Sequence, residues 1–144
     1  MSGKSERVRA TGGCLCGAVR YEVRGELRPG IACHCTQCRK QTGHFLVSSA
    51  CRREDLRLTR EEGLRWYESS AIARRGFCAR CGSVLFWEGK GKDDISMSAG
   101  SLDSPTGIAI DRHIFVADKG DYYEIEDGLP QFEAGSDSKR LKAG

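Results

Sequence analysis

Hydrophobic and polar residues alternate along much of the chain with the period of β-strands. Residues 18–24 place Val19, Tyr21 and Val23 on one face and charged side chains on the other, which is typical of a half-buried strand. Similar short segments predict further strands at 45–51, 64–68, 72–77, 84–87, 95–99 and 114–117. The chain is therefore predicted to be mainly β.

Turns and short helical segments separate these strands. The run 89–93 (Gly-Lys-Gly-Lys-Asp) predicts a hairpin turn. One helical turn is predicted over 36–41, before Gly43, and a second over 53–56. Short strands rather than long helices are therefore expected.

The composition fits one small globular domain. The chain has 144 residues, 39% of them hydrophobic, with 18 glycines and three prolines, a balance that favours short strands and many turns. No apolar run approaches the ~20 residues that span a bilayer, and the charged start lacks the apolar stretch of a signal peptide. We expect one domain at 10–133 between flexible tails at 1–9 and 134–144, located in the reducing cytoplasm and without a membrane partner.

The charge distribution disfavours nucleic acid as a partner. The net charge of +3 comes from the ends, since residues 11–135 carry 17 basic and 18 acidic side chains. Residues 39–80 nevertheless hold ten basic against five acidic side chains, beginning with Arg39 and Lys40. Two interpretations stay open: a solvated face with surface ion pairs, or attraction of a small carboxylate-bearing ligand.

Cysteine clustering gives the strongest chemical signal. Seven of the eight cysteines lie in three clusters: Cys14 and Cys16; Cys33, Cys35 and Cys38; Cys78 and Cys81. In a reducing compartment such clusters favour metal over disulfides. Tetrahedral zinc, at a Zn–S distance of about 2.3 Å, needs sulfurs less than ~4 Å apart, which close pairs on tight turns provide. Gly82, after Cys81, suits a turn with positive φ.

The seven cysteines divide most simply into a group of four and a group of three. The run from Cys33 to Cys38 can supply three thiolates and leave one metal position for a substrate, whereas the two pairs can complete a closed, structural site. Other pairings stay open at this stage. The 61-residue loop between Cys16 and Cys78 costs roughly 3–4 kcal/mol to close. Structural zinc contributes about 10–16 kcal/mol, so we expect the metal-free chain to fold poorly.

The remaining candidate residues favour structural roles. Cys51 is predicted to be a buried thiol, His34 to point away from the neighbouring ligands, His113 to be a hydrogen-bonded structural histidine, and His44 to begin a strand rather than act as an acid or base. Asp103 and Asp111 are predicted in turns. Core positions are predicted for the aromatic residues Trp66, Tyr67, Phe86 and Trp87.

Several motifs resemble the glutathione-dependent formaldehyde-activating enzyme family. They are Gly12-Gly13-Cys14-Leu15-Cys16-Gly17, Cys33-His34-Cys35-Thr36-Gln37-Cys38-Arg39-Lys40, Phe77-Cys78-Ala79-Arg80-Cys81-Gly82, Ala99-Gly100-Ser101-Leu102-Asp103, His113-Ile114-Phe115-Val116 and Asp127-Gly128-Leu129-Pro130. The resemblance implies an Mss4-like fold of packed antiparallel sheets with zinc-binding knuckles and two Zn²⁺ ions per chain. It implies a structural zinc on Cys14, Cys16, Cys78 and Cys81, and a reactive zinc on Cys33, Cys35 and Cys38.

The activity implied by this resemblance is that of a carbon–sulfur lyase or synthase. The family's reaction reversibly joins glutathione and formaldehyde to give S-(hydroxymethyl)glutathione, so a small thiol and a small aldehyde are the expected partners. Gln37, Arg39 and Thr42, on the three-cysteine loop, are the expected substrate-binding residues. The alternative is a zinc-stabilised binding or scaffold module without catalysis. Edge strands make a homodimer a further hypothesis.

Overall fold

The computed structural model describes residues 7–141, which form two compact units. The first unit contains the chain up to Arg28 together with Ser49–Ile108, and the second contains Pro29–Ser48 and the chain from Ala109 onward. The parts of the predicted tails at 1–6 and 142–144 lie outside the described residues. The predicted mainly β fold is confirmed, and most neighbouring strands pair in the antiparallel direction.

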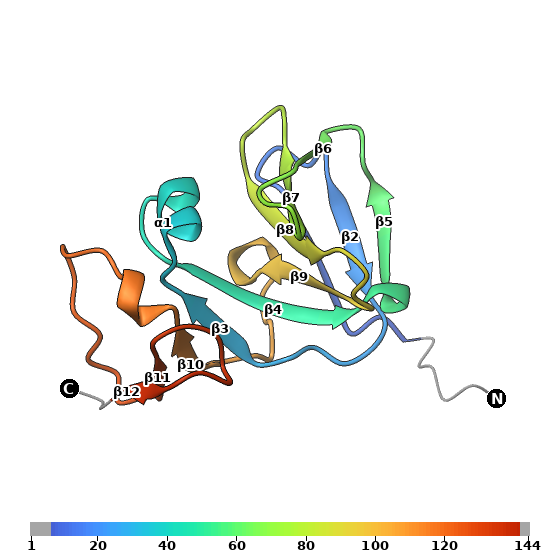
Figure 1. Ribbon diagram of the computed structural model, residues 1–144. Coiled ribbons are helices and arrows are strands. Elements are labelled where there is room, and N and C mark those ends of the chain that lie inside the picture. Colours follow the sequence, from blue (N-terminus) through green and yellow to red (C-terminus); the bar gives the residue numbers. More distant parts are fainter. Residues whose placement is uncertain (1–6, 142–144) are drawn as a thin grey trace. The chain divides into compact units, whose positions relative to one another are not determined.

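Two antiparallel sheets build the first unit (Figure 1). One has the order β1-β2-β5, with β1 at Ala10–Gly13, β2 at Arg20–Val23 and β5 at Leu56–Arg60. The other contains, in spatial order, β6 at Leu64–Tyr67, β7 at Ala73–Cys78, β8 at Val84–Gly89 and β9 at Asp94–Ser98. Short 3₁₀ turns lie at Arg53–Asp55 (η1) and Ala99–Ser101 (η2).

The core of the first unit forms where the predicted apolar face of β2 meets β8. Val19, Tyr21 and Val23 are almost completely buried, and the Tyr21 ring meets Phe86 edge-to-face at 5.2 Å between centroids. The Trp66 ring stacks on Phe86 at 6.0 Å between centroids, as expected of a core aromatic residue. The core prediction for Tyr67 is wrong: this side chain is 64% exposed, because successive residues of β6 face opposite ways.

A mixed sheet and one helix build the second unit. The strand order is β12-β11-β10-β3-β4, and β10 runs parallel to both β3 and β11. The strand bounds are β3 Gly30–Cys33, β4 Leu46–Arg52, β10 Ile110–Ile114, β11 Gln131–Phe132 and β12 Arg140–Leu141. From Ser49 onward, β4 belongs to the first unit.

The helical predictions and one strand prediction can be compared with this second unit. The turn predicted at 36–41 is helix α1 (Thr36–Thr42), which ends at Gly43 in the left-handed conformation. The strand predicted at 114–117 is wrong, since β10 ends at Ile114 and residues Val116–Asp118 form the 3₁₀ turn η3. Phe115 has a φ of 57°, which breaks the extended backbone.

Two further predictions of local structure are confirmed. The hairpin turn falls between Gly89, the end of β8, and Asp94, the start of β9. The second helical turn is η1. Within residues 7–141, α1 is the longest helix at seven residues, and no helix there combines the length and apolar character needed to cross a membrane.

Candidate metal centres

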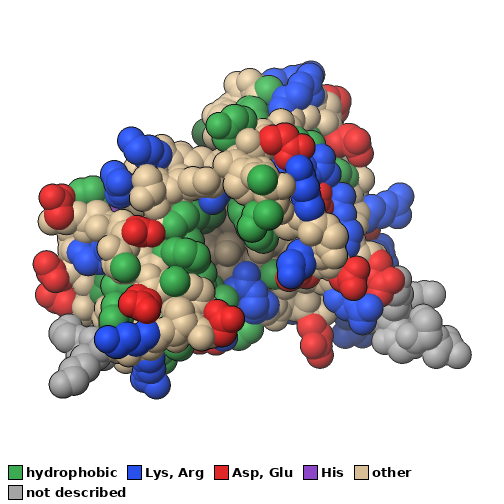
Figure 2. Space-filling model, in the orientation of Figure 1, with side chains coloured by type: hydrophobic (Ala, Val, Ile, Leu, Met, Phe, Trp, Pro, Cys, Tyr) green, Lys and Arg blue, Asp and Glu red, His purple; other side chains and the backbone are tan. Residues whose placement is uncertain are grey.

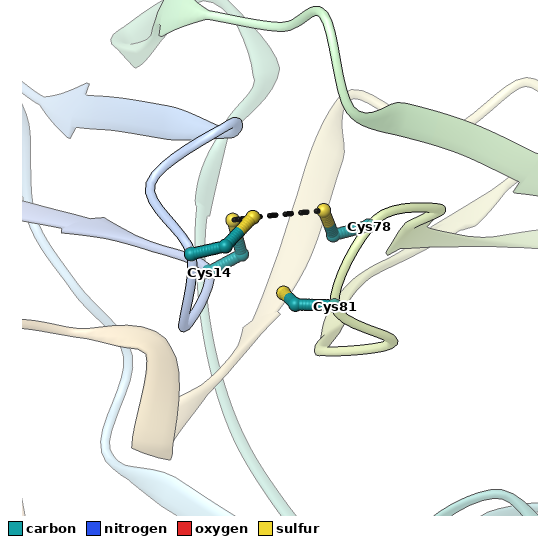
Figure 3. Close-up of side chains that lie close together, drawn as sticks. Cys14, Cys78 and Cys81 are labelled. Atoms are coloured by element: carbon teal, nitrogen blue, oxygen red, sulfur yellow. Dashed lines mark hydrogen bonds between the residues drawn. The ribbon is translucent and has the colours of Figure 1, made fainter.

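Four cysteines converge in the first unit from two separate knuckles. Cys14 and Cys16 lie between β1 and β2, Cys78 ends β7, and Cys81 lies in the turn before β8. Their sulfur atoms all lie within 4.8 Å of one another, with Cys14–Cys16 at 3.7 Å and Cys16–Cys78 at 3.8 Å (Figure 3). A tetrahedral ion with bonds of about 2.3 Å places its sulfur ligands about 3.8 Å apart. The four thiols therefore fit a zinc-sized ion.

Hydrogen bonds fix the sulfur atoms of this group. The Val19 N–H donates to the Cys14 sulfur at 3.2 Å. The Ser83 hydroxyl lies 3.2 Å from the Cys81 sulfur and accepts from the Leu15 N–H at 3.0 Å, so it joins the two knuckles. The hydrogen bond between the Ser83 hydroxyl and the Cys81 sulfur is the main cause that lowers the pKa of Cys81 to about 5. The thiolate form, which binds metal, is therefore favoured before any metal binds.

Two glycines allow the knuckles to approach each other. Gly82 has the predicted positive φ, 79°, in the turn after Cys81. Gly63 donates its N–H to Ala18 O at 3.1 Å and accepts from the Ala79 N–H at 2.7 Å, so its backbone ties one knuckle to the other. A Cβ on Gly63 would lie 2.8 Å from the Cys78 sulfur. The four-cysteine group thus depends on a contact that only glycine permits.

Three cysteines form the second group, in the other unit. Cys33 ends β3, Cys35 is the N-cap of α1, and Cys38 lies in its first turn. Their sulfur atoms lie within 4.8 Å of one another, and the Cys38 N–H donates to the Cys35 sulfur at 3.3 Å. Within residues 7–141 this group contains three possible ligands and the other contains four. A three-thiolate set fits a metal whose fourth ligand is a substrate.

The electrostatics of the second group favour a bound cation. Hydrogen bonding to Cys35 and Cys38 and burial raise the pKa of Cys33 far above the usual thiol range. Three thiolates so close together repel one another, and a divalent ion between them removes that penalty. The group is thus suited to a metal rather than to a free nucleophilic thiolate.

The expected substrate-binding residues all lie on α1. Gln37 is exposed, and Arg39 is half-buried. The Thr42 hydroxyl donates to Cys38 O at 2.7 Å and accepts from the His44 N–H at 3.2 Å. Thr42 therefore stabilises the end of the helix that carries Cys38.

Histidines lie beside the second group. His34, between two of its cysteines, is fully buried, and its ring bonds to the Tyr123 hydroxyl and to His113. His113 also bonds to Asp127, so its predicted structural hydrogen bonding is confirmed. Sequence reasoning missed Tyr123, because its hydrogen bond to His34 joins residues 89 positions apart. Asp127 lies in the motif at 127–130, but the motif did not indicate its hydrogen bond to His113.

Two other sequence predictions can be compared with the structure. Cys51 is buried in the core of the first unit and outside both groups, and burial raises its pKa to about 12. On the face in Figure 2, basic side chains stand among acidic ones. Arg60 pairs with Glu62, and Arg74 pairs with Glu88. These pairs agree with the interpretation of the basic segment as a solvated face.

Comparisons with known proteins show that the chain is similar to members of one family. A family model described as glutathione-dependent formaldehyde-activating enzyme matches residues 9–118. An uncharacterized lyase of Schizosaccharomyces pombe is 27% identical over 122 residues, covering 84% of this chain and 88% of the relative. A Halomonas elongata protein provisionally named a glutathione-dependent formaldehyde-activating enzyme is 28% identical over 125 residues, covering 80% of each chain.

One similar solved structure supports the fold. It is the crystal structure of a Rhodobacter sphaeroides protein, with a TM-score of 0.56 and 29% sequence identity. The similarity covers 65% of this chain and 88% of the other. The segment matched by the family model contains all seven clustered cysteines.

Proposed function

The chain belongs to the glutathione-dependent formaldehyde-activating enzyme family, and on that premise we propose that it is a zinc-dependent carbon–sulfur lyase acting on thiol–aldehyde adducts. Its reaction is the reversible joining of a small thiol, such as glutathione, to a small aldehyde, such as formaldehyde. The three-cysteine group of Cys33, Cys35 and Cys38 carries this proposal, because it offers a metal one ligand fewer than a closed site.

The chemistry requires three changes. The thiol loses its proton, its sulfur forms a bond to the carbonyl carbon, and the carbonyl oxygen gains a proton. A zinc ion, when bound, stabilises the thiolate form of sulfur and polarises a carbonyl oxygen. The protein must supply a positive environment for the anionic substrate and a path for the proton.

Residues of α1 are suited to bind the thiol. Arg39 is half-buried one residue after Cys38, and Lys40 is exposed beside it. Both are basic residues of the last turn and can attract the carboxylates of a glutathione-like thiol. Gln37, exposed on the same helix, offers amide donors and an acceptor. Thr42 contributes by holding the helix end.

The four-cysteine group has a structural role in this proposal. Its ligands come from residues 62 positions apart, and a closed four-thiolate ion links such segments without a position for substrate. Because thiolate ligands are preserved in a reducing compartment, we expect the protein to act in the cytoplasm.

The test compares Cys35→Ser with Cys51→Ala, a matched change of a buried thiol outside both groups. We expect wild type and Cys51→Ala to bind two zinc ions and to speed up exchange between glutathione, formaldehyde and their adduct, measured by exchange NMR. Cys35→Ser should stay folded, bind one zinc ion fewer and give only the uncatalysed rate. Equal acceleration by Cys35→Ser would refute the lyase proposal. If wild type binds zinc but gives no acceleration with any thiol–aldehyde pair, a scaffold function is favoured instead.

A further inference from the structure

A small cavity in the first unit is lined mainly by basic residues. Its volume is about 260 Å³, and its walls come from η1, from β7 and from the turn that joins β8 to β9. The charged residues of the lining are four cations and one carboxylate: Arg53, Arg74, Lys90, Lys92 and Glu88. Four positive charges against one negative give this lining a formal charge of +3.

The carboxylate of Glu88 lies between the two arginines and orients both of them. Arg74 donates through Nε to Glu88 Oε1 at 2.6 Å, and Arg53 Nη1 lies 3.1 Å from Glu88 Oε2. The Glu88 side chain is only 15% exposed. The Arg74 guanidinium also lies over the Trp66 ring, 3.9 Å from its centroid, and this stacking fixes the plane of the guanidinium. Both arginines are therefore held in defined positions.

Glu88 cannot satisfy all of the positive charge and all of the donors around it. A carboxylate accepts about four hydrogen bonds, whereas each guanidinium carries about five N–H groups. Lys90 lies 3.9 Å from Glu68, but these two side chains are 59% and 66% exposed, and such exposed pairs contribute little. Positive charge and hydrogen-bonding capacity therefore remain for an anion.

The backbone brings the basic residues together. The Arg53 N–H donates to Asp93 O at 2.7 Å, which ties η1 to the β8–β9 turn, and the Lys92 N–H donates to Gly89 O at 3.2 Å within that turn. A Cβ on Gly89 would lie 2.9 Å from Lys92 Cγ, so the missing side chain leaves room for the Lys92 stem. A site assembled in this way loses less entropy when it binds a ligand.

The cavity lies at the opposite end of the β7–β8 pair from the four-cysteine group. Arg74 is the second residue of β7 and Cys78 is the last, so these positions are about 13 Å apart at about 3.3 Å per residue. Glu88 likewise lies near the end of β8, whereas Val84, its first residue, follows the knuckle. A small ligand in the cavity would therefore not reach the metal ligands of this unit.

We propose that this cavity binds a small phosphomonoester, with its phosphate group among Arg53, Arg74 and Lys92. A phosphate ester carries a charge of about −1.5 to −2 at pH 7, and the planar fork of arginine matches its oxygens. The volume lies below the roughly 300–1,000 Å³ of pockets for larger ligands, so a short carbon chain fits better than a nucleotide. The site does not depend on the proposed lyase activity.

A dicarboxylate is the closest competing ligand. It carries the same charge as a phosphomonoester but divides that charge between two groups separated by carbon atoms. Four cations around one small cavity instead favour charge concentrated on a single group. Succinate therefore serves as the comparison ligand in the test.

The test is a titration of the ¹⁵N-labelled, metal-loaded full chain at constant ionic strength, which is set with chloride. We expect glycerol 3-phosphate and inorganic phosphate to shift the Nε signals of Arg53 and Arg74 and the backbone signals of 88–92 until saturation. Succinate should bind more weakly. The proposal is overturned if wild type shows no saturable shift, or if succinate binds as tightly as glycerol 3-phosphate. Binding to vesicles containing phosphatidic acid without binding of glycerol 3-phosphate would also overturn it.

Lys92→Gln removes one cation of the lining and leaves both contacts of Glu88 with the arginines in place. It should weaken the binding of glycerol 3-phosphate by about fivefold or more, as expected for the loss of one neighbouring charge. Arg57→Gln is the matched control, because Arg57 is exposed on β5 and outside the cavity, and it should keep wild-type affinity. Wild-type affinity in Lys92→Gln would overturn the proposal.

Glu88→Gln distinguishes a ligand site from an ion-pair network that is complete without a ligand. Loss of the negative charge in the lining should tighten the binding of glycerol 3-phosphate by about fivefold or more. Saturating ligand should then raise the Tm of Glu88→Gln by more than that of wild type, since tighter binding to the folded state gives more stabilisation. A lower Tm that the ligand does not raise would favour the network and overturn the proposal. If this variant does not fold, the comparison of Lys92→Gln with Arg57→Gln decides.

Discussion

Substitution of Gly63 by alanine tests how rigidly the two knuckles of the four-cysteine group are held. The new Cβ would lie 2.8 Å from the Cys78 sulfur and 2.9 Å from the Ala18 Cβ, both closer than real contacts allow. The backbone cannot retreat easily, because Gly63 is hydrogen-bonded to Ala18 on one side and Ala79 on the other. Either the sulfur or the chain must move.

The expected magnitude follows from these contacts. Overpacking by one methyl group in a fixed environment costs about 1–3 kcal/mol, which for a chain of this length lowers Tm by roughly 4–12 °C. Part of the strain falls on the Cys78 sulfur, which is fully buried. We therefore expect the metal affinity of the four-cysteine group to fall at least about tenfold, equivalent to about 1.4 kcal/mol.

The assay measures thermal unfolding and competition for zinc with a chromophoric chelator. The matched control is Gly91→Ala, in the β8–β9 turn, where φ is 73° and a Cβ would meet nothing within 4 Å. Left-handed strain should cost this variant about 1–2 kcal/mol with no change in metal affinity. If Gly63→Ala keeps the wild-type Tm and zinc affinity, the knuckles are free to rearrange and the reasoning is wrong.

Three further predictions concern stability. Burial raises the pKa of Tyr21 to about 12 from an ordinary 10.0, so its contribution is complete below pH 10, and about 3 kcal/mol is lost as the pH rises from 10 to 12. Urea unfolding of Tyr21→Phe should lack this alkaline loss, and at pH 7 should show about 1 kcal/mol lower stability from the missing 2.6 Å bond to Ser101; an unchanged alkaline slope would contradict the assignment. Asp103→Asn, which weakens a half-exposed pair with Arg20, should cost at most about 1 kcal/mol by the same assay, and a loss above 2 kcal/mol would show that the pair is more than a surface contact. Removing metal with a chelator should abolish cooperative thermal unfolding; an unaltered melting curve would contradict metal-dependent folding.

Local features were predictable from the sequence because they depend on neighbours in the chain. The alternation around Tyr21 identified the buried face of β2. The cysteine spacing identified the three clusters of possible ligands, since residues two or three positions apart on a tight turn must stay close. The turn at Gly43 and the helix before it followed from the same local rules.

Strands without a local pattern could not be found in this way. β1 has the sequence Ala-Thr-Gly-Gly, which has no alternation, and it is extended because it pairs with β2. β3 has no polar face and pairs in parallel with β10, about eighty residues further along the chain. Such strands are defined by their partners rather than by their own residues.

The sequence by itself determined which residues can bind metal, because thiol chemistry and the spacing within each knuckle are covalent properties of the chain. Only the tertiary structure decided which clusters join, that Gly63 and Ser83 connect the two knuckles, and that Tyr123, His34, His113 and Asp127 form one hydrogen-bonded series. These contacts join residues far apart in sequence. Packing and hydrogen-bond satisfaction select them, and neither leaves a periodic signal along the chain.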